Sequence, residues 1–193
     1  MTVKKIVILG PESTGKSTLC EQLATHYKTV WVPEYARTYL HDHGMDYSYD
    51  DLLTIAKGQL ALEDKYLADF QKIPESRLSG RSDSRLSRSP VFIDTNMYVI
   101  KVWCEFVFGK CHDWILHQIV LREYDLNLLC NIDLPWIKDE LREYPDFESR
   151  QKLFWIYKDI MVNQAVPWVQ ISGDYKQRFI KAVKAVDDLL AAQ

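Results

Sequence analysis

Hydrophobic residues in this chain fall into short runs that alternate with longer segments of helical spacing. Residues Lys5 to Gly10 include a β-branched run, which is typical of a strand buried on both faces. Similar runs follow at 29–32, 90–94, 126–132 and 168–171. The pattern therefore predicts five strands.

The segments between these runs carry apolar residues at the spacing of an amphipathic helix. Leu19, Cys20, Leu23 and Ala24 share one face of a helix over residues 16–27, directly after the first strand. Further helices are expected at 36–43, 50–71, around 99–107, and from about Asp174 to the end. Strands that alternate with helices indicate an α/β fold, a three-layer α/β/α sandwich around a five-stranded parallel sheet.

One segment departs from this alternation, because residues 76–89 are rich in serine and arginine and contain two apolar side chains. The composition favours a flexible, solvated insertion in the loop before the third strand. The alternative interpretation is an arm for anionic partners, or a phosphorylation site.

Length and charge narrow the class of protein. A chain of 193 residues is expected to form a single domain, and its net charge of −3 offers no basic field for nucleic acid or an acidic membrane. The apolar run near the N-terminus is too short for a signal peptide, so a cytoplasmic location is expected. The four cysteines have no metal-site spacing. The oligomeric state is left open.

The strongest chemical signal is the segment between the first strand and the first helix, which fits the P-loop pattern G-x-x-x-x-G-K-[ST]. In such a loop, inward-facing N–H groups and the positive end of the helix bind phosphate oxygens. Lys16 is expected to reach the β- and γ-phosphates of ATP, and Ser17 to bind Mg²⁺. The predicted ATP-binding residues are Gly10, Pro11, Glu12, Ser13, Thr14, Gly15, Lys16, Ser17 and Thr18.

Polar residues also follow two other predicted strands, at the sheet edge where ligands of parallel sheets bind. Asp94 ends an apolar strand, as the metal-side carboxylate of a Walker B segment does. Glu34 follows the second strand and is placed to take a hydroxyl proton or to bind substrate hydroxyls. Arg37 could pair with Glu34 or contact a phosphate. Sequence alone leaves open whether Glu34 or Asp94 is the base.

Residues 134–152 are charged, interrupted by Pro145, and lie where a kinase lid would close over phosphates. If Pro145 separates two helices, Arg142 and Arg150 could both point inward and neutralise charge on the transferred phosphoryl group. The alternative is a solvated helical hairpin.

Taken in order, Gly10–Leu19, Glu34–Arg37, Phe92–Thr95 and Trp136–Arg142 resemble the ribosylnicotinamide kinase domain of NadR-type proteins, a branch of the small P-loop kinases. The resemblance covers nearly the whole chain outside residues 76–89. One departure is Pro33, which stands where the family carries an aromatic residue before the glutamate.

The resemblance implies a P-loop kinase that uses ATP and Mg²⁺ to phosphorylate the ribose 5′-hydroxyl of nicotinamide riboside. Its catalytic residues would be Lys16, Glu34, Asp94, Arg142 and Arg150, its substrate-binding residues Glu34, Tyr35, Arg37 and Asp94, and its metal ligands Ser17 and Asp94. Adenylyl transfer and repression, which such proteins carry on other domains, are not expected. Two alternatives stay open: a kinase for another nucleoside or small alcohol, and a nucleotide-dependent switch that binds a protein partner.

Overall fold

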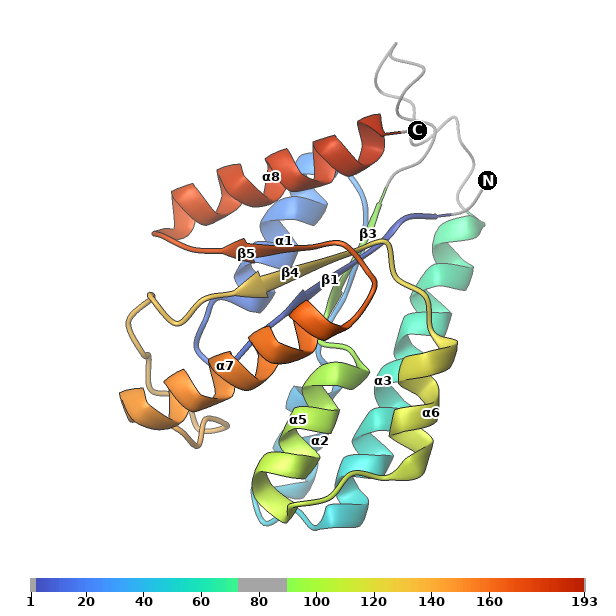
Figure 1. Cartoon of the computed structure of the whole chain (residues 1–193). Helices are drawn as coiled ribbons and strands as arrows, with labels where there is room; N and C mark the ends of the chain where they lie inside the picture. Colours follow the sequence, from blue (N-terminus) through green and yellow to red (C-terminus); the bar gives the residue numbers. More distant parts are fainter. Residues whose placement is uncertain (1–2, 73–89, 193) are drawn as a thin grey trace.

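The computed structural model describes residues 3–72 and 90–192, which form a parallel sheet between two layers of helices (Figure 1). The strands are β1 (Lys5–Leu9), β2 (Trp31–Val32), β3 (Val91–Asp94), β4 (Leu126–Cys130) and β5 (Trp168–Ile171), in the spatial order β2-β3-β1-β4-β5. The helices are α1 (Lys16–Tyr27), α2 (Tyr35–His43), α3 (Tyr49–Gln71), α5 (Met97–Phe108), α6 (Asp113–Leu121), α7 (Phe147–Asn163) and α8 (Tyr175–Ala191). The predicted α/β fold with five parallel strands is confirmed.

The central strand β1 is buried on both faces, which explains its unbroken apolar run. Ile6 and Ile8 pack against α1 and α8, whereas Val7 and Leu9 face the layer that contains α5 and α7. Figure 1 shows α1 and α8 together on one side of the sheet, with α3, α5 and α7 on the other.

A third apolar cluster joins α2, α3, α5 and α6 beyond the β2 edge of the sheet. Its buried members include Ala36, Leu52, Ile100 and Ile115. This cluster fixes α2, α3 and α5 against one another, and α2 and α5 supply one wall of the cavity described below.

Several boundaries differ from the sequence-based expectations. The strand predicted at 29–32 is reduced to β2, and the run at 126–132 stops at Cys130 as a strand. Helix α6 is not predicted at all, because Leu116, Val120 and Leu121 are exposed and its apolar residues lie all round the helix. The segment 76–89, predicted to be a flexible insertion, lies outside the described residues.

All four cysteines are free, and Cys20, Cys104 and Cys130 are buried, as expected for small apolar groups. Across residues 3–72 and 90–192, none of the helices is both long enough and apolar enough to cross a bilayer.

Candidate active site

The loop from Gly10 to Gly15 turns sharply between β1 and α1. Gly10 has φ of 135°, and a Cβ atom there would lie 2.7 Å from the carbonyl oxygen of Cys130 at the end of β4. Gly15 is the N-cap of α1 with φ of 76°, and no side chain caps the helix. The first N–H groups of α1 are therefore left to an external acceptor, which is the arrangement of an anion-binding helix terminus.

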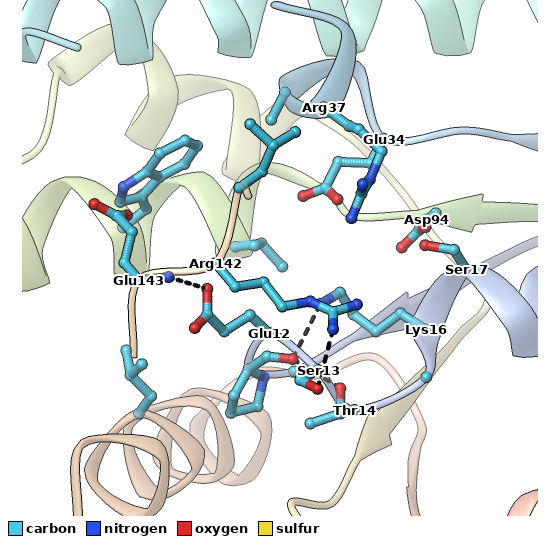
Figure 2. A pocket seen from close by; sticks show the side chains of 18 of the residues that line it. Glu12, Ser13, Thr14, Lys16, Ser17, Glu34, Arg37, Asp94, Arg142 and Glu143 are labelled. Carbon is cyan, nitrogen blue, oxygen red and sulfur yellow. Dashed lines mark hydrogen bonds between the residues drawn. The ribbon is translucent and has the colours of Figure 1, made fainter. Parts of the chain in front are cut away.

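Two side chains of the loop bind its own backbone. The Thr14 hydroxyl donates to the carbonyl oxygen of Pro11 at 2.7 Å, and the Lys16 ammonium donates to the same oxygen at 3.0 Å. Lys16 therefore lies over the hollow of the loop rather than in solvent (Figure 2). The predicted phosphate-binding geometry of strand, turn and helix is present in full.

The loop forms one wall of a cavity of about 430 Å³. The opposite walls come from the ends of β2 and β3, from α2 and α5, and from the segment 141–144. Of the residues predicted to act in catalysis or binding, the cavity brings together Lys16, Ser17, Glu34, Arg37, Asp94 and Arg142.

Asp94 ends β3 next to the phosphate-binding loop, because Asp94 pairs in register with Ile8 of β1. The residue is fully buried, and neither carboxylate oxygen has a hydrogen-bond partner among the described residues. Burial, and then the nearby Glu34 carboxylate, raise the pKa of Asp94 to about 7, against the opposing effects of Lys16 and the Ser17 hydroxyl.

This orphaned carboxylate fits a divalent cation. The Ser17 side chain lies beside Asp94 without an ordinary hydrogen bond between them (Figure 2). A hydroxyl and one carboxylate are the protein ligands that Mg²⁺ takes in phosphate sites, where phosphates and water complete the shell. Within the described ranges, no cluster of three or more His, Cys, Asp or Glu side chains offers an alternative metal site.

Glu34 lies at the N-cap of α2, across the cavity from the phosphate-binding loop (Figure 2). It accepts a long hydrogen bond of 3.5 Å from the Thr95 hydroxyl. Thr95 has φ of 76°, a costly conformation for a β-branched residue. Arg37 does not pair with Glu34: its guanidinium binds the Asp139 carboxylate at 3.1 Å.

Gln59 of α3, which the sequence analysis did not single out, joins the ends of β2 and β3. Its side-chain oxygen accepts the N–H of Tyr35 at 2.7 Å, and its amide donates to the carbonyls of Pro33 and Asp94 at 3.4 and 3.5 Å. Gln59 is buried, so these bonds fix the spacing of the two strands that present Glu34 and Asp94. A lone glutamine in a helical pattern gives no sequence signal for this role.

The segment predicted as a lid does not contain two helices separated by Pro145, so the alternative of a helical hairpin is also absent. Residues 135–146 are irregular apart from one turn, and a single helix, α7, begins at Phe147. The irregular part binds the phosphate-binding loop: Glu12 accepts the N–H groups of Glu143 and Tyr144 at 3.1 and 2.6 Å, as Figure 2 shows in part.

The two predicted lid arginines have different positions. Arg142 lines the cavity, and its guanidinium donates to the Ser13 hydroxyl at 3.3 Å. Arg150 is buried outside the cavity lining and donates to the carbonyls of Ile132 and Leu134 at 3.4 and 3.2 Å. The expectation that Arg150 points into the site therefore needs correction, because these carbonyls hold its guanidinium at the base of the segment.

Another part of the cavity lining is aromatic and acidic. Trp103, Phe106, Tyr144 and Tyr157 line it together with Glu143. Partial desolvation raises the pKa of Glu143, and a hydrogen bond from Tyr47 opposes this effect. The Trp103 indole N–H donates to the Tyr47 hydroxyl at 2.9 Å. Hydrogen bonds through Tyr47 therefore hold the Glu143 carboxylate in position. The sequence analysis did not single out Glu143.

Comparisons with known proteins agree with this geometry. A family model described as AAA domain matches residues 5–178. The "Trifunctional NAD biosynthesis/regulator protein NadR" of Escherichia coli (strain K12) is 27% identical over 193 residues, an alignment that covers 99% of this chain and 44% of that protein. The chain thus spans less than half the length of this curated relative. The predicted resemblance to NadR-type proteins is confirmed.

Two solved structures share the fold. A crystal structure of NadR protein in complex with NR matches with a TM-score of 0.75 at 22% identity, over 99% of this chain and 50% of that chain. A thymidylate kinase from Ehrlichia chaffeensis matches with a TM-score of 0.59 at 16% identity, over 97% of this chain and 100% of that chain. The fold is that of the P-loop kinases.

The burial of Asp94 predicts a pH-dependent cost to stability. Its pKa rises from 3.8 in the unfolded chain to about 7 in the folded protein. The contribution of this group to the free energy of unfolding is therefore fully present below pH 4 and is lost as the pH rises through 7. Asp94→Asn should therefore stabilise the ligand-free protein at pH 8 by about 1–3 kcal/mol, with little effect at pH 4. Urea unfolding at both pH values measures this. A variant that is less stable at pH 8 would contradict it.

Proposed function

The chain belongs to the family described as AAA domain, and from this premise we propose that it is an ATP-dependent kinase for the ribose 5′-hydroxyl of nicotinamide riboside. The product would be nicotinamide mononucleotide. One observation carries the proposal: a single cavity is lined by the phosphate-binding loop, by the carboxylates of Glu34 and Asp94, and by a group of aromatic and acidic side chains that we call the acidic hollow.

The phosphate-binding loop supports the nucleotide side of the proposal. Backbone N–H groups at the start of α1 and the Lys16 ammonium would bind the β- and γ-phosphates of ATP. Ser17 and Asp94 would hold Mg²⁺, which when bound neutralises charge on the polyphosphate. Arg142 would contact the transferred group, a role supported by its position in the cavity lining beside Ser13.

The acidic and aromatic hollow supports the acceptor side. The nicotinamide ring of the riboside is flat and carries a positive charge, so aromatic faces and a carboxylate complement it. Trp103, Phe106 and Tyr144 offer the rings, and Glu143 offers the charge. Glu34 would then bind the ribose and take the proton of the 5′-hydroxyl as that oxygen attacks the γ-phosphorus, while the bond from the γ-phosphorus to the β–γ bridging oxygen breaks and ADP leaves.

We propose Glu34 rather than Asp94 as the base because of where the two carboxylates lie. Glu34 lies on the acceptor side at the start of α2, whereas Asp94 lies beside Ser17 at the phosphate-binding loop. Tyr35, the other residue predicted to bind substrate, does not line the cavity, and its N–H donates to the Gln59 side chain. Arg37 lines the cavity but is paired with Asp139, so it would contact the substrate only after that ion pair opens.

A panel of acceptors tests the proposal directly. ATP consumption should rise with nicotinamide riboside and respond far less to adenosine, thymidine or simple alcohols. Lys16→Ala should abolish the response, because it removes the ammonium beside the phosphates. A faster rate with another nucleoside would move the substrate assignment to that nucleoside. Slow hydrolysis indifferent to every acceptor would favour a nucleotide-dependent switch.

Glu143→Gln removes the negative charge of the hollow while keeping its shape. We expect KM for nicotinamide riboside to rise about tenfold, kcat to change little, and KM for ATP to stay the same. Glu123→Gln, the same charge change on an exposed residue outside the cavity lining, is the matched control. An unchanged KM for the riboside would show that Glu143 does not recognise the ring.

The roles of Glu34 and Asp94 can be separated by their dependence on Mg²⁺. The measurement is the steady-state rate of Glu34→Gln and of Asp94→Asn over a range of Mg²⁺ concentrations. At ordinary Mg²⁺ both rates should be lower than the wild-type rate by about 100-fold or more. High Mg²⁺ should restore part of the Asp94→Asn rate, because the lost ligand weakens metal binding. If it restores Glu34→Gln instead, the two assignments are reversed.

A further inference from the structure

Arg178 is a buried arginine in the first turns of α8, with 2% of its surface exposed. It does not line the cavity, yet its guanidinium reaches the phosphate-binding loop. One nitrogen donates to the carbonyl oxygen of Thr14 at 2.9 Å, while others donate to the carbonyls of Asn131 and Gly173, each at 2.8 Å. Arg178 therefore joins the loop to the segments that follow β4 and β5.

The bond to Thr14 constrains the peptide that follows it. In a trans peptide the C=O and the next N–H point in opposite directions, and every peptide bond of the described chain is trans. Because the Thr14 carbonyl is held toward Arg178, the Gly15 N–H must point the other way, toward the hollow of the loop. Gly15 has φ of 76°, a backbone conformation that a glycine adopts without the steric strain that a Cβ atom would cause.

We propose that Arg178 is a positioning residue for ATP binding, which fixes the Thr14–Gly15 peptide so that the Gly15 N–H faces a bound phosphate. The role is geometric rather than electrostatic. The guanidinium forms an ion pair with Asp133, and this pairing offsets the charge that a phosphate would meet. The inference rests on the phosphate-binding part of the proposed function and is independent of which acceptor is used.

A planar guanidinium suits this task better than any other side chain. Its five N–H groups form a rigid fork, so one residue can hold three carbonyls and a carboxylate at once. A lysine could keep the ion pair with Asp133 but could not hold all three carbonyls in the same geometry. Arg178→Lys should therefore show an intermediate defect, and Arg178→Met a full one.

The test compares binding of Mg·ATP and of nicotinamide riboside by calorimetry in wild type, Arg178→Lys and Arg178→Met. We expect Kd for ATP to rise about tenfold in Arg178→Met and less in Arg178→Lys, with Kd for the riboside unchanged. The matched control is Arg122→Met, because Arg122 also pairs with carboxylates, Asp64 and Glu63, away from the cavity. That variant should lose thermal stability but keep its affinity for ATP.

A second readout follows the amide itself. The chain contains seven glycines, so labelling with ¹⁵N-glycine gives a simple amide spectrum. In this spectrum the chemical shift of the Gly15 amide proton should change strongly when Mg·AMP-PNP binds the wild-type protein. At saturating nucleotide, this change in chemical shift should be smaller in Arg178→Lys than in the wild type. Because Arg178→Lys is the milder variant, the measurement can be made even if Arg178→Met does not fold.

The outcomes separate this inference from the proposed function. Wild-type ATP affinity and an unchanged Gly15 shift in the Arg178 variants would overturn the inference alone. A wild type that binds ATP but not the riboside would overturn the acceptor and leave Arg178 in its role. A wild type that does not bind ATP would overturn both.

Discussion

The parallel pairing of β3 with β1 is the constraint on which the site depends. Its register sets Asp94 opposite Ile8, one residue before β1 ends. Because β3 lies between β1 and β2, the same pairing brings the residues after β2 to the same edge. The phosphate-binding loop, the Asp94 carboxylate and Glu34 thus meet at the carboxyl ends of three adjacent strands, where open parallel sheets bind ligands.

The arrangement of these residues lowers the stability of the folded protein when no ligand is bound. Asp94 is buried without a hydrogen bond, and the next residue, Thr95, has a positive φ. Both features oppose folding, and both lie within the candidate site. A structure selected for stability alone would place an apolar residue or an asparagine at position 94. The cost makes sense if a bound cation and phosphate relieve it, which is the usual relation between stability and function at an active site.

The sequence was most informative where function needs residues adjacent in the chain. The phosphate-binding loop requires a fixed spacing of glycine, lysine and serine, so its position and role could be predicted, and β5 was predicted to the residue. The lid was harder to predict: two helices separated by Pro145 were one arrangement that the sequence allowed, whereas residues 135–146 form no helix. Helix α6 was missed because apolar residues surround it.

The residues that sequence reasoning missed act over long distances in the chain. Gln59 contacts the Asp94 carbonyl, 35 positions away, and Arg178 contacts Thr14, 164 positions away. Neither has a local pattern to distinguish it from a polar residue on the outer face of its helix. Only the fold shows that each is buried, and a buried polar group must find a partner. In both residues that partner is the backbone of the site.

The contacts of the phosphate-binding loop also bear on the proposal that one cavity binds two ligands. Glu12 and Ser13 lie in the loop, yet their side chains bind the segment that carries Arg142, Glu143 and Tyr144. The loop is therefore joined directly to the segment that contributes acidic and aromatic side chains to the cavity. Two cationic side chains, Lys16 and Arg142, line the same cavity as the carboxylates of Glu34, Asp94 and Glu143. The proposed pair of an anionic phosphate donor and a cationic acceptor would match this mixed lining, whereas two anionic ligands would leave the carboxylates without a cationic partner.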